Sequence, residues 1–188
     1  MIRDAGVDDL RVNVTSLLAE PVGSTRDLAL QAVSLGLGED LALARPVRAR
    51  FRLTRTNRGI LVEGDVGAAL AETCSRCLRP IEVEVEGEIA EEALPSVELT
   101  TGAPVDMTAE PDVARLNKHH ELDVEPLVRE AIELAAPIAA LCRPDCPGLC
   151  AVCGEPLRDG AHDHGEEPID PRLEVLRGFR VDAEDENG

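Results

Sequence analysis

The clearest pattern in the chain is an alternation of apolar and charged residues between positions 46 and 91. One run reads Val47-Arg-Ala-Arg-Phe-Arg-Leu53 and another reads Ile81-Glu-Val-Glu-Val-Glu86. A period of two is typical of strands that bury one face. Residues 60–71 lie between these runs and follow Asn57-Arg-Gly59, a sequence suited to a hairpin turn. The pattern therefore predicts an antiparallel meander of strands.

A helical spacing replaces this alternation after Asp123. Apolar residues recur at positions 127, 128, 131, 132, 134 and 135, which places them on one side of a helix. We expect Asp123 to cap that helix, Pro126 to lie in its first turn and Pro137 to end it. Proline and glycine interruptions in residues 95–121 predict a long irregular loop. A short last helix is expected to begin at Asp170.

These elements predict an α+β fold, in which an antiparallel β-meander is joined by a long helix in the C-terminal half and a Cys/His zinc-binding loop. We expect residues 1–141 to form the α+β core, with a Cys74-x-x-Cys77 turn. Residues 142–180 would form the Cys/His zinc-binding segment and the short helix. Residues 181–188 would be a disordered acidic tail.

Composition changes this picture in two ways. The chain of 188 residues has no Trp or Tyr and only two Phe, so aliphatic side chains must build the core and a structural metal becomes more useful. It also has six Cys, no apolar run of signal-peptide length at its start and no run of 18 apolar residues. We therefore expect a cytoplasmic protein with reduced thiols and no membrane partner.

Eight cysteine and histidine side chains gather in two places. The first place is the Cys74-x-x-Cys77 turn between two predicted strands. The second place holds Cys142, Cys146, Cys150, Cys153, His162 and His164. Zinc takes four thiolate or imidazole ligands in a tetrahedron, so eight ligands make two complete sites.

Spacing favours one division of these ligands. One ion would take Cys150, Cys153, His162 and His164. The other would take Cys74, Cys77, Cys142 and Cys146, which would tie the sheet turn to the end of the long helix. One zinc ion with spare thiols remains an alternative, as does a reduced or redox-active Cys74–Cys77 pair, although redox motifs usually begin a helix in a βαβ unit. His119 and His120 are expected to be exposed loop residues.

The sequence does not favour catalysis. Catalytic zinc keeps an open coordination position, whereas eight ligands fill two tetrahedra. The chain has no nucleophile elbow, phosphate loop or dinucleotide fingerprint. We therefore expect neither an enzyme nor a small-molecule substrate. A metal-dependent hydrolase would need an open coordination position, which the spacing does not favour.

Charge is distributed unevenly along the chain. The net charge is −18, yet residues 45–79 hold eight arginines and only three carboxylates. The arginine stripe consists of Arg48, Arg50 and Arg52 on one face of one predicted strand, with Arg76 and Arg79 on the adjoining cysteine turn. Such a stripe on an acidic protein suits phosphate contacts at one place. The alternative is a sheet in which these arginines pair with Glu82, Glu84 and Glu86.

Four stretches, in this order, resemble the YceD family of large ribosomal RNA subunit accumulation proteins. They are Cys74-Ser-Arg-Cys-Leu-Arg-Pro80, Glu130-Ala-Ile-Glu-Leu-Ala-Ala-Pro-Ile138, Cys142-Arg-Pro-Asp-Cys-Pro-Gly-Leu-Cys-Ala-Val-Cys-Gly154 and Asp170-Pro-Arg-Leu173. The resemblance covers nearly the whole chain and is most specific from residue 59 to residue 180. One departure is His162-Asp-His164, where many members carry Cys-x-Cys; imidazole can replace thiolate on zinc.

The resemblance implies a non-catalytic role in the accumulation of large-subunit ribosomal RNA and in ribosome assembly. The implied partners are ribosomal RNA or a large-subunit ribosomal protein, and the cofactor would be one or two structural zinc ions. A thiol redox or zinc-storage protein is the alternative function. It predicts an exposed, readily oxidised Cys74–Cys77 pair.

Overall fold

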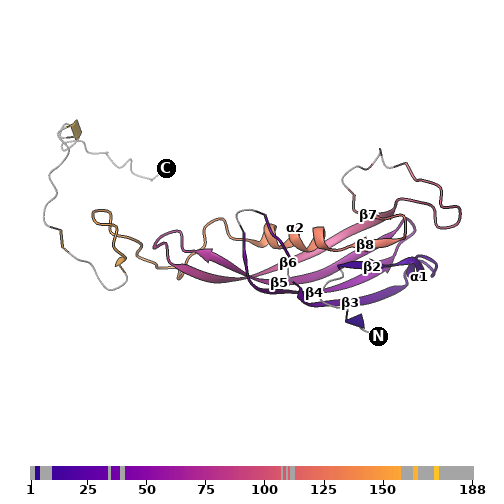
Figure 1. Cartoon of the computed structure of the whole chain (residues 1–188), viewed down its shortest axis with the longest axis horizontal. Coiled ribbons are helices and arrows are strands. Elements are labelled where there is room, and N and C mark those ends of the chain that lie inside the picture. Colours follow the sequence, from indigo (N-terminus) through magenta and orange to yellow (C-terminus); the bar gives the residue numbers. More distant parts are fainter. Residues whose placement is uncertain are drawn as a thin grey trace, which may run out of the picture.

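A computed structural model describes residues 3–4, 10–33, 35–38, 41–106, 108, 110, 113–157, 163–164 and 172–173. Its largest element is an elongated sheet that runs along the length of the molecule (Figure 1). The sheet contains, in spatial order, β1 (Arg3–Asp4), β3 (Thr25–Val33), β4 (Leu43–Arg55), β5 (Ile60–Thr73), β6 (Pro80–Pro95) and β7 (Arg115–Leu116). A second sheet pairs β2 (Arg11–Asn13) with β8 (Glu121–Asp123).

The antiparallel meander is present in β3, β4, β5 and β6, each of which pairs antiparallel with the next. The short edge strands β1 and β7 pair parallel with β3 and β6, so the sheet is mixed. The loop expected at 95–121 is broken by β7 and by a bridge between Val97 and Pro104. Within the described residues, the fold is mostly sheet.

The helices are short. The first, α1, spans Thr15–Leu18 and the second, α2, spans Glu125–Ala135, which is eleven residues. The long helix expected in the C-terminal half is therefore not found, although α2 ends before Pro137 as expected, because the residue before a proline is extended. The expected cap was also wrong. Val124 is the capping residue, whereas Asp123 ends β8 and accepts a hydrogen bond from the Glu125 amide (3.1 Å).

The core lies on one face of the sheet, here called the inner face. The alternating apolar residues of β4 and β5 point to it, and Leu53, Val62 and Leu70 are completely buried there. The inner face is covered by α2, which packs mainly against β6 through Leu127, Val128, Ala131 and Ile132. The approach is closest at Gly87, where a Cβ atom would lie 2.5 Å from the Ala131 carbonyl oxygen. Only glycine fits this position.

The opposite face of the sheet, the outer face, carries the charged half of the alternation. Arg48, Arg50 and Arg52 are all exposed on it. On the neighbouring strand, the register places Asp65 beside Arg50 and Glu63 beside Arg52. The outer face is therefore a polar surface in which basic and acidic strands lie side by side.

The described helices include none that is both long enough and apolar enough to cross a membrane.

Candidate metal centre

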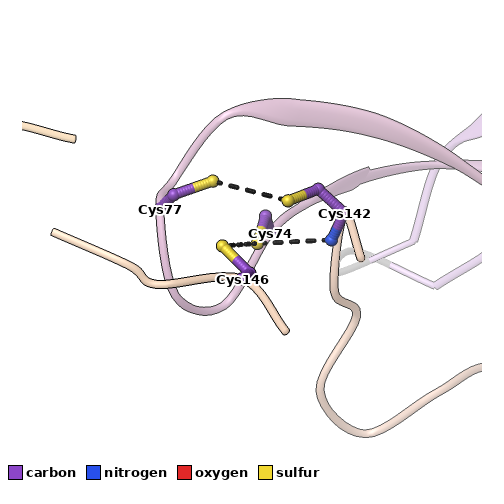
Figure 2. A group of neighbouring side chains, drawn as sticks. All are labelled: Cys74, Cys77, Cys142 and Cys146. Atoms are coloured by element: carbon purple, nitrogen blue, oxygen red, sulfur yellow. Dashed lines mark hydrogen bonds between the residues drawn. The ribbon is translucent and has the colours of Figure 1, made fainter. Parts of the chain in front are cut away.

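A tight turn between β5 and β6 carries the first two cysteines. The Cys74 amide donates to the Arg79 carbonyl oxygen (2.9 Å), and the Leu78 amide donates to the Cys74 carbonyl oxygen (2.9 Å). Leu78 has a φ of 57°, a left-handed conformation that a non-glycine residue adopts only when its surroundings hold it there. The turn brings the Cys74 and Cys77 side chains to the same side (Figure 2).

The segment after α2 returns to this turn. The Ser75 amide donates to the Ala140 carbonyl oxygen (2.8 Å), and the Arg76 guanidinium donates to the carbonyl oxygens of Pro144 (3.4 Å) and Cys146 (3.0 Å). Gly148, with a φ of 81°, continues the segment close to the Arg76 backbone. These contacts position Cys142 and Cys146 opposite the turn. Arg76 thus contacts protein backbone at the centre.

The four sulfur atoms of Cys74, Cys77, Cys142 and Cys146 all lie within 4.8 Å of one another. The Cys74–Cys146 and Cys77–Cys142 sulfur distances are both 3.9 Å (Figure 2). Four thiolates at about 2.3 Å from one tetrahedral zinc ion would be about 3.8 Å apart, so the geometry fits such an ion. Cys74 and Cys146 are buried, while Cys77 and Cys142 are half-buried. This is the set that spacing assigned to one ion.

The protonation of these thiols is unequal. Hydrogen bonds from the backbone amides of Cys77 and Cys142 outweigh desolvation and lower the pKa of Cys74 to about 6. Desolvation is the largest cause that raises the pKa of Cys142 to about 12, and the hydrogen bonds that its thiol shares with the sulfur atoms of Cys146, Cys74 and Cys77 act in the same direction. Negative charge therefore concentrates on the buried Cys74 sulfur. A bound cation would favour the thiolate form of all four ligands.

A second group is more open. Cys150, Cys153 and His164 offer ligand atoms within 4.8 Å of one another, and the Cys150 sulfur lies 3.2 Å from His164 Nε2. A turn positions the two cysteines, because the Gly154 amide donates to the Cys150 carbonyl oxygen (2.9 Å). Cys153 and His164 are exposed. The expected fourth ligand, His162, lies outside the described residues, as does most of the short helix expected at Asp170 and the whole of the 181–188 tail.

The arginine stripe is only partly paired with acids. Arg52 Nε lies 3.1 Å from Asp27 Oδ1 on β3. Glu82 and Glu84 pair with Arg45, which precedes the stripe on β4, and the Arg45–Glu82 distance is 3.2 Å. Within the described part of the chain, neither Arg48 nor Arg50 makes an ion pair. Of the three stripe arginines on β4, only Arg52 is therefore paired with an acid among the described residues.

The outer face is also hollowed around this stripe. A hollow of about 940 Å³ is lined by Arg50, Arg52 and four carboxylates: Asp27, Glu63, Asp65 and Glu88. These acids become neighbours of the stripe through the register of the strands, which residue spacing in the sequence does not reveal. Arg79 is exposed at the cysteine turn.

The two histidines next to Lys118 behave differently from each other. His119 is exposed, as expected. His120 is half-buried, has a φ of 54°, and its Nδ1 atom is buried with no hydrogen-bond partner among the described residues. The expectation of an exposed His120 was wrong, because its carbonyl oxygen accepts a hydrogen bond from the Val14 amide and holds the loop against the core (2.9 Å).

Comparison with known proteins gives one family and several uncharacterized relatives. A family model described as large ribosomal RNA subunit accumulation protein YceD matches residues 62–180. The chain is 32% identical over 159 residues to uncharacterized proteins Rv2926c of Mycobacterium tuberculosis and Mb2951c of Mycobacterium bovis, covering 85% of this chain and 71% of each relative. It is 30% identical over 127 residues to uncharacterized protein ML1660 of Mycobacterium leprae, covering 67% of this chain and 55% of the relative. No solved structure matches.

Proposed function

The chain belongs to the YceD family, and from this premise we propose that it is a non-catalytic cytoplasmic factor for the accumulation of large-subunit ribosomal RNA and for ribosome assembly. The family match over residues 62–180 is the observation that carries this proposal. It covers all six cysteines, nearly all of β5 and the whole of β6, and it begins after β4. The proposed partner is ribosomal RNA or a large-subunit ribosomal protein.

Structural zinc is the second part of the proposal. Four cysteine sulfurs at the geometry of a tetrahedron are a donor set typical of structural zinc, because such a site is closed to water and substrate. Cys74, Cys77, Cys142 and Cys146 would hold the ion. It would supply a cross-link between the β5–β6 turn and the segment after α2 rather than a reactive position. The proposal of a non-catalytic protein rests on this closed donor set.

The arginine stripe would supply the contact with ribosomal RNA. Arg48 and Arg50 are exposed and make no ion pair among the described residues, so their guanidinium groups can meet phosphate oxygens. The neighbouring carboxylates of β5 and β6 would repel nucleic acid beyond the stripe. Contact with RNA would therefore be confined to one strand of the outer face.

A gene deletion in the native host tests this function. We expect the deletion strain to contain less large-subunit ribosomal RNA relative to small-subunit ribosomal RNA, and the wild-type gene to restore the ratio. A gene carrying R48A, R50A and R52A together should restore it only in part. Quantification of both RNAs by gel and by sequencing of precursor ends gives the measurement.

The controls separate the parts of this proposal. A control variant carries R11A and R26A, which remove arginines of β2 and β3 that lie outside the stripe. It should restore the ratio fully, provided that all variants accumulate to the same level as the wild type. An unchanged ratio in the deletion strain contradicts the proposed function. Full restoration by the triple variant contradicts only the role of the arginine stripe.

The alternative function is a thiol redox or zinc-storage protein, and one observation favours it. Cys150, Cys153 and His164 form a largely exposed group, so that solvent and oxidants can reach its thiols and any ion that it binds. This alternative predicts a normal ribosomal RNA ratio in the deletion strain together with altered tolerance of zinc limitation or of oxidants. The same deletion strain therefore distinguishes the two functions.

A further inference from the structure

The strand β6 is an edge strand over nearly all of its length. Its residues 80–93 pair with β5 on one side. On its other side only Leu94 and Pro95 pair, with β7. Among the described residues, no backbone or side-chain group makes a hydrogen bond to the β6 backbone between Ile81 and Ala93 on that open side. Figure 1 shows β6 at the border of the long part of the sheet, beside α2.

An open edge of this length is unusual, because unpaired strand edges bind other strands indiscriminately. The fourteen residues that pair with β5 extend for about 45 Å. Proteins usually shorten such edges, cover them or place charge along them. Here the charge has one sign. Glu82, Glu84, Glu86 and Glu88 are all exposed on the outer face of the edge strand.

This row of glutamates excludes one occupant. A second copy of the chain pairing through β6 would bring two rows of glutamate side by side, and like charges on neighbouring strands are destabilising. A segment with basic residues at alternate positions would instead place each positive charge beside a glutamate. Glu86 and Glu88 make no ion pair among the described residues, so their charge is available.

The inner side of the edge indicates which residues would fit at the other alternate positions of the bound segment. Val83 of β6 packs against the core but is only partly buried, and α2 packs mainly against β6. Near the end of α2, Leu134 is 80% exposed, and Ile138, which follows the helix, is completely exposed. An added strand would present its second set of alternate side chains to this apolar layer. Apolar residues would fit there.

We propose that the open edge of β6 binds an extended polypeptide segment in which basic and apolar residues alternate, and that this segment adds a strand to the sheet. Backbone hydrogen bonds would supply affinity, and the alternation would supply specificity. This surface lies on β6 and is distinct from the arginine stripe on β4. The inference does not depend on the proposed role in ribosomal RNA accumulation.

Synthetic peptides of fourteen residues, the length of the β5-paired stretch, test this proposal on the full-length protein. One peptide alternates lysine with valine, a second alternates glutamate with valine, and a third has the composition of the first with its lysines and valines in two blocks. We expect the first to bind at least tenfold more tightly than either of the others in calorimetric titrations. Hydrogen exchange of amides in residues 81–93 should slow when it binds.

Charge reversal on the edge provides the matched variant. E86K with E88K should weaken binding of the lysine peptide at least tenfold and should allow the glutamate peptide to bind. E20K with E98K makes the same change in net charge at exposed positions outside β6 and should leave binding unchanged. A gain of binding to the glutamate peptide is a result that misfolding does not produce.

Four outcomes would overturn the proposal. The first is equal binding of the alternating and blocked lysine peptides, which would mean unspecific charge attraction. The second is an equal effect of the two double variants. The third is slowed exchange that does not include β6. The last is that the wild-type protein sediments as a dimer whose two copies pair through β6, since a second copy would then already occupy the edge.

Discussion

Cys74 is the residue on which the metal centre depends most. Its side chain is completely buried, its sulfur accepts a hydrogen bond from the Cys142 amide (3.4 Å), and it lies 3.9 Å from the Cys146 sulfur. We predict that C74S removes the ion of this centre, because a serine hydroxyl is a poor zinc ligand and three cysteines leave the tetrahedron open. Metal analysis of protein purified without a metal-binding tag should show about one zinc ion fewer per chain.

The same variant should be less stable. A ligand that binds only the folded state at a thousand times its dissociation constant contributes about 4 kcal/mol, and C74S would lose a contribution of that order. Urea unfolding in buffer with defined free zinc measures it. C153S, in the more open group, is the control and should leave the ion of the first centre in place. Equal zinc content in wild type and C74S would contradict the assignment of Cys74 as a ligand.

At the scale of single residues, the sequence indicated which cysteines lie together better than it indicated which acids lie next to the arginine stripe. The short separations within Cys74-x-x-Cys77 and between Cys142 and Cys146 pointed to two halves of one centre, and the structure brings those four sulfurs together. The acids that surround the arginine stripe were not predicted. Asp27 reaches Arg52 only because of the register between β3 and β4, and register depends on pairing over the whole strand.

At the scale of elements, the contact between α2 and β6 depends on one small residue. We predict that G87A destabilises the protein by about 1–3 kcal/mol, because the new methyl group would overlap the Ala131 carbonyl and force the helix away from the sheet. Urea unfolding of the full chain measures this change. The matched control is G67A on β5, where an added Cβ meets nothing within 4 Å; its effect should stay within about 0.5 kcal/mol.

Strands were easier to predict than the helix for a physical reason. Each long strand carries its own period of two, so β4 and β6 are visible in the local sequence. The C-terminal end of α2 was predicted, because its apolar spacing continues to Ala135 and Pro137 forces the preceding residue out of the helical region. At the other end, Asp123 forms β8 with β2 instead of capping the helix, since pairing with a distant strand outweighs local capping preference.

At the scale of the whole molecule, the metal centre would connect two parts that are far apart in the sequence. Cys74 and Cys77 belong to the sheet, whereas Cys142 and Cys146 begin the Cys/His segment. Few other described contacts make this connection: the Ser75–Ala140 hydrogen bond and the Arg76 contacts are the principal ones. With the ion removed, this segment would rest on a few hydrogen bonds, while the sheet would keep its aliphatic core.

We therefore predict that chelation of zinc makes residues 136–157 sensitive to protease while the sheet remains resistant. Limited proteolysis followed by mass spectrometry should place new cleavage sites in that segment and leave a protected fragment that contains β3, β4, β5 and β6. A C150S and C153S double variant is the control, because its increased cleavage should be confined to residues after Gly148. If chelation instead opens the sheet as readily as the segment, zinc stabilises the entire fold, and the centre would be part of the core's stability instead of a tie between two parts.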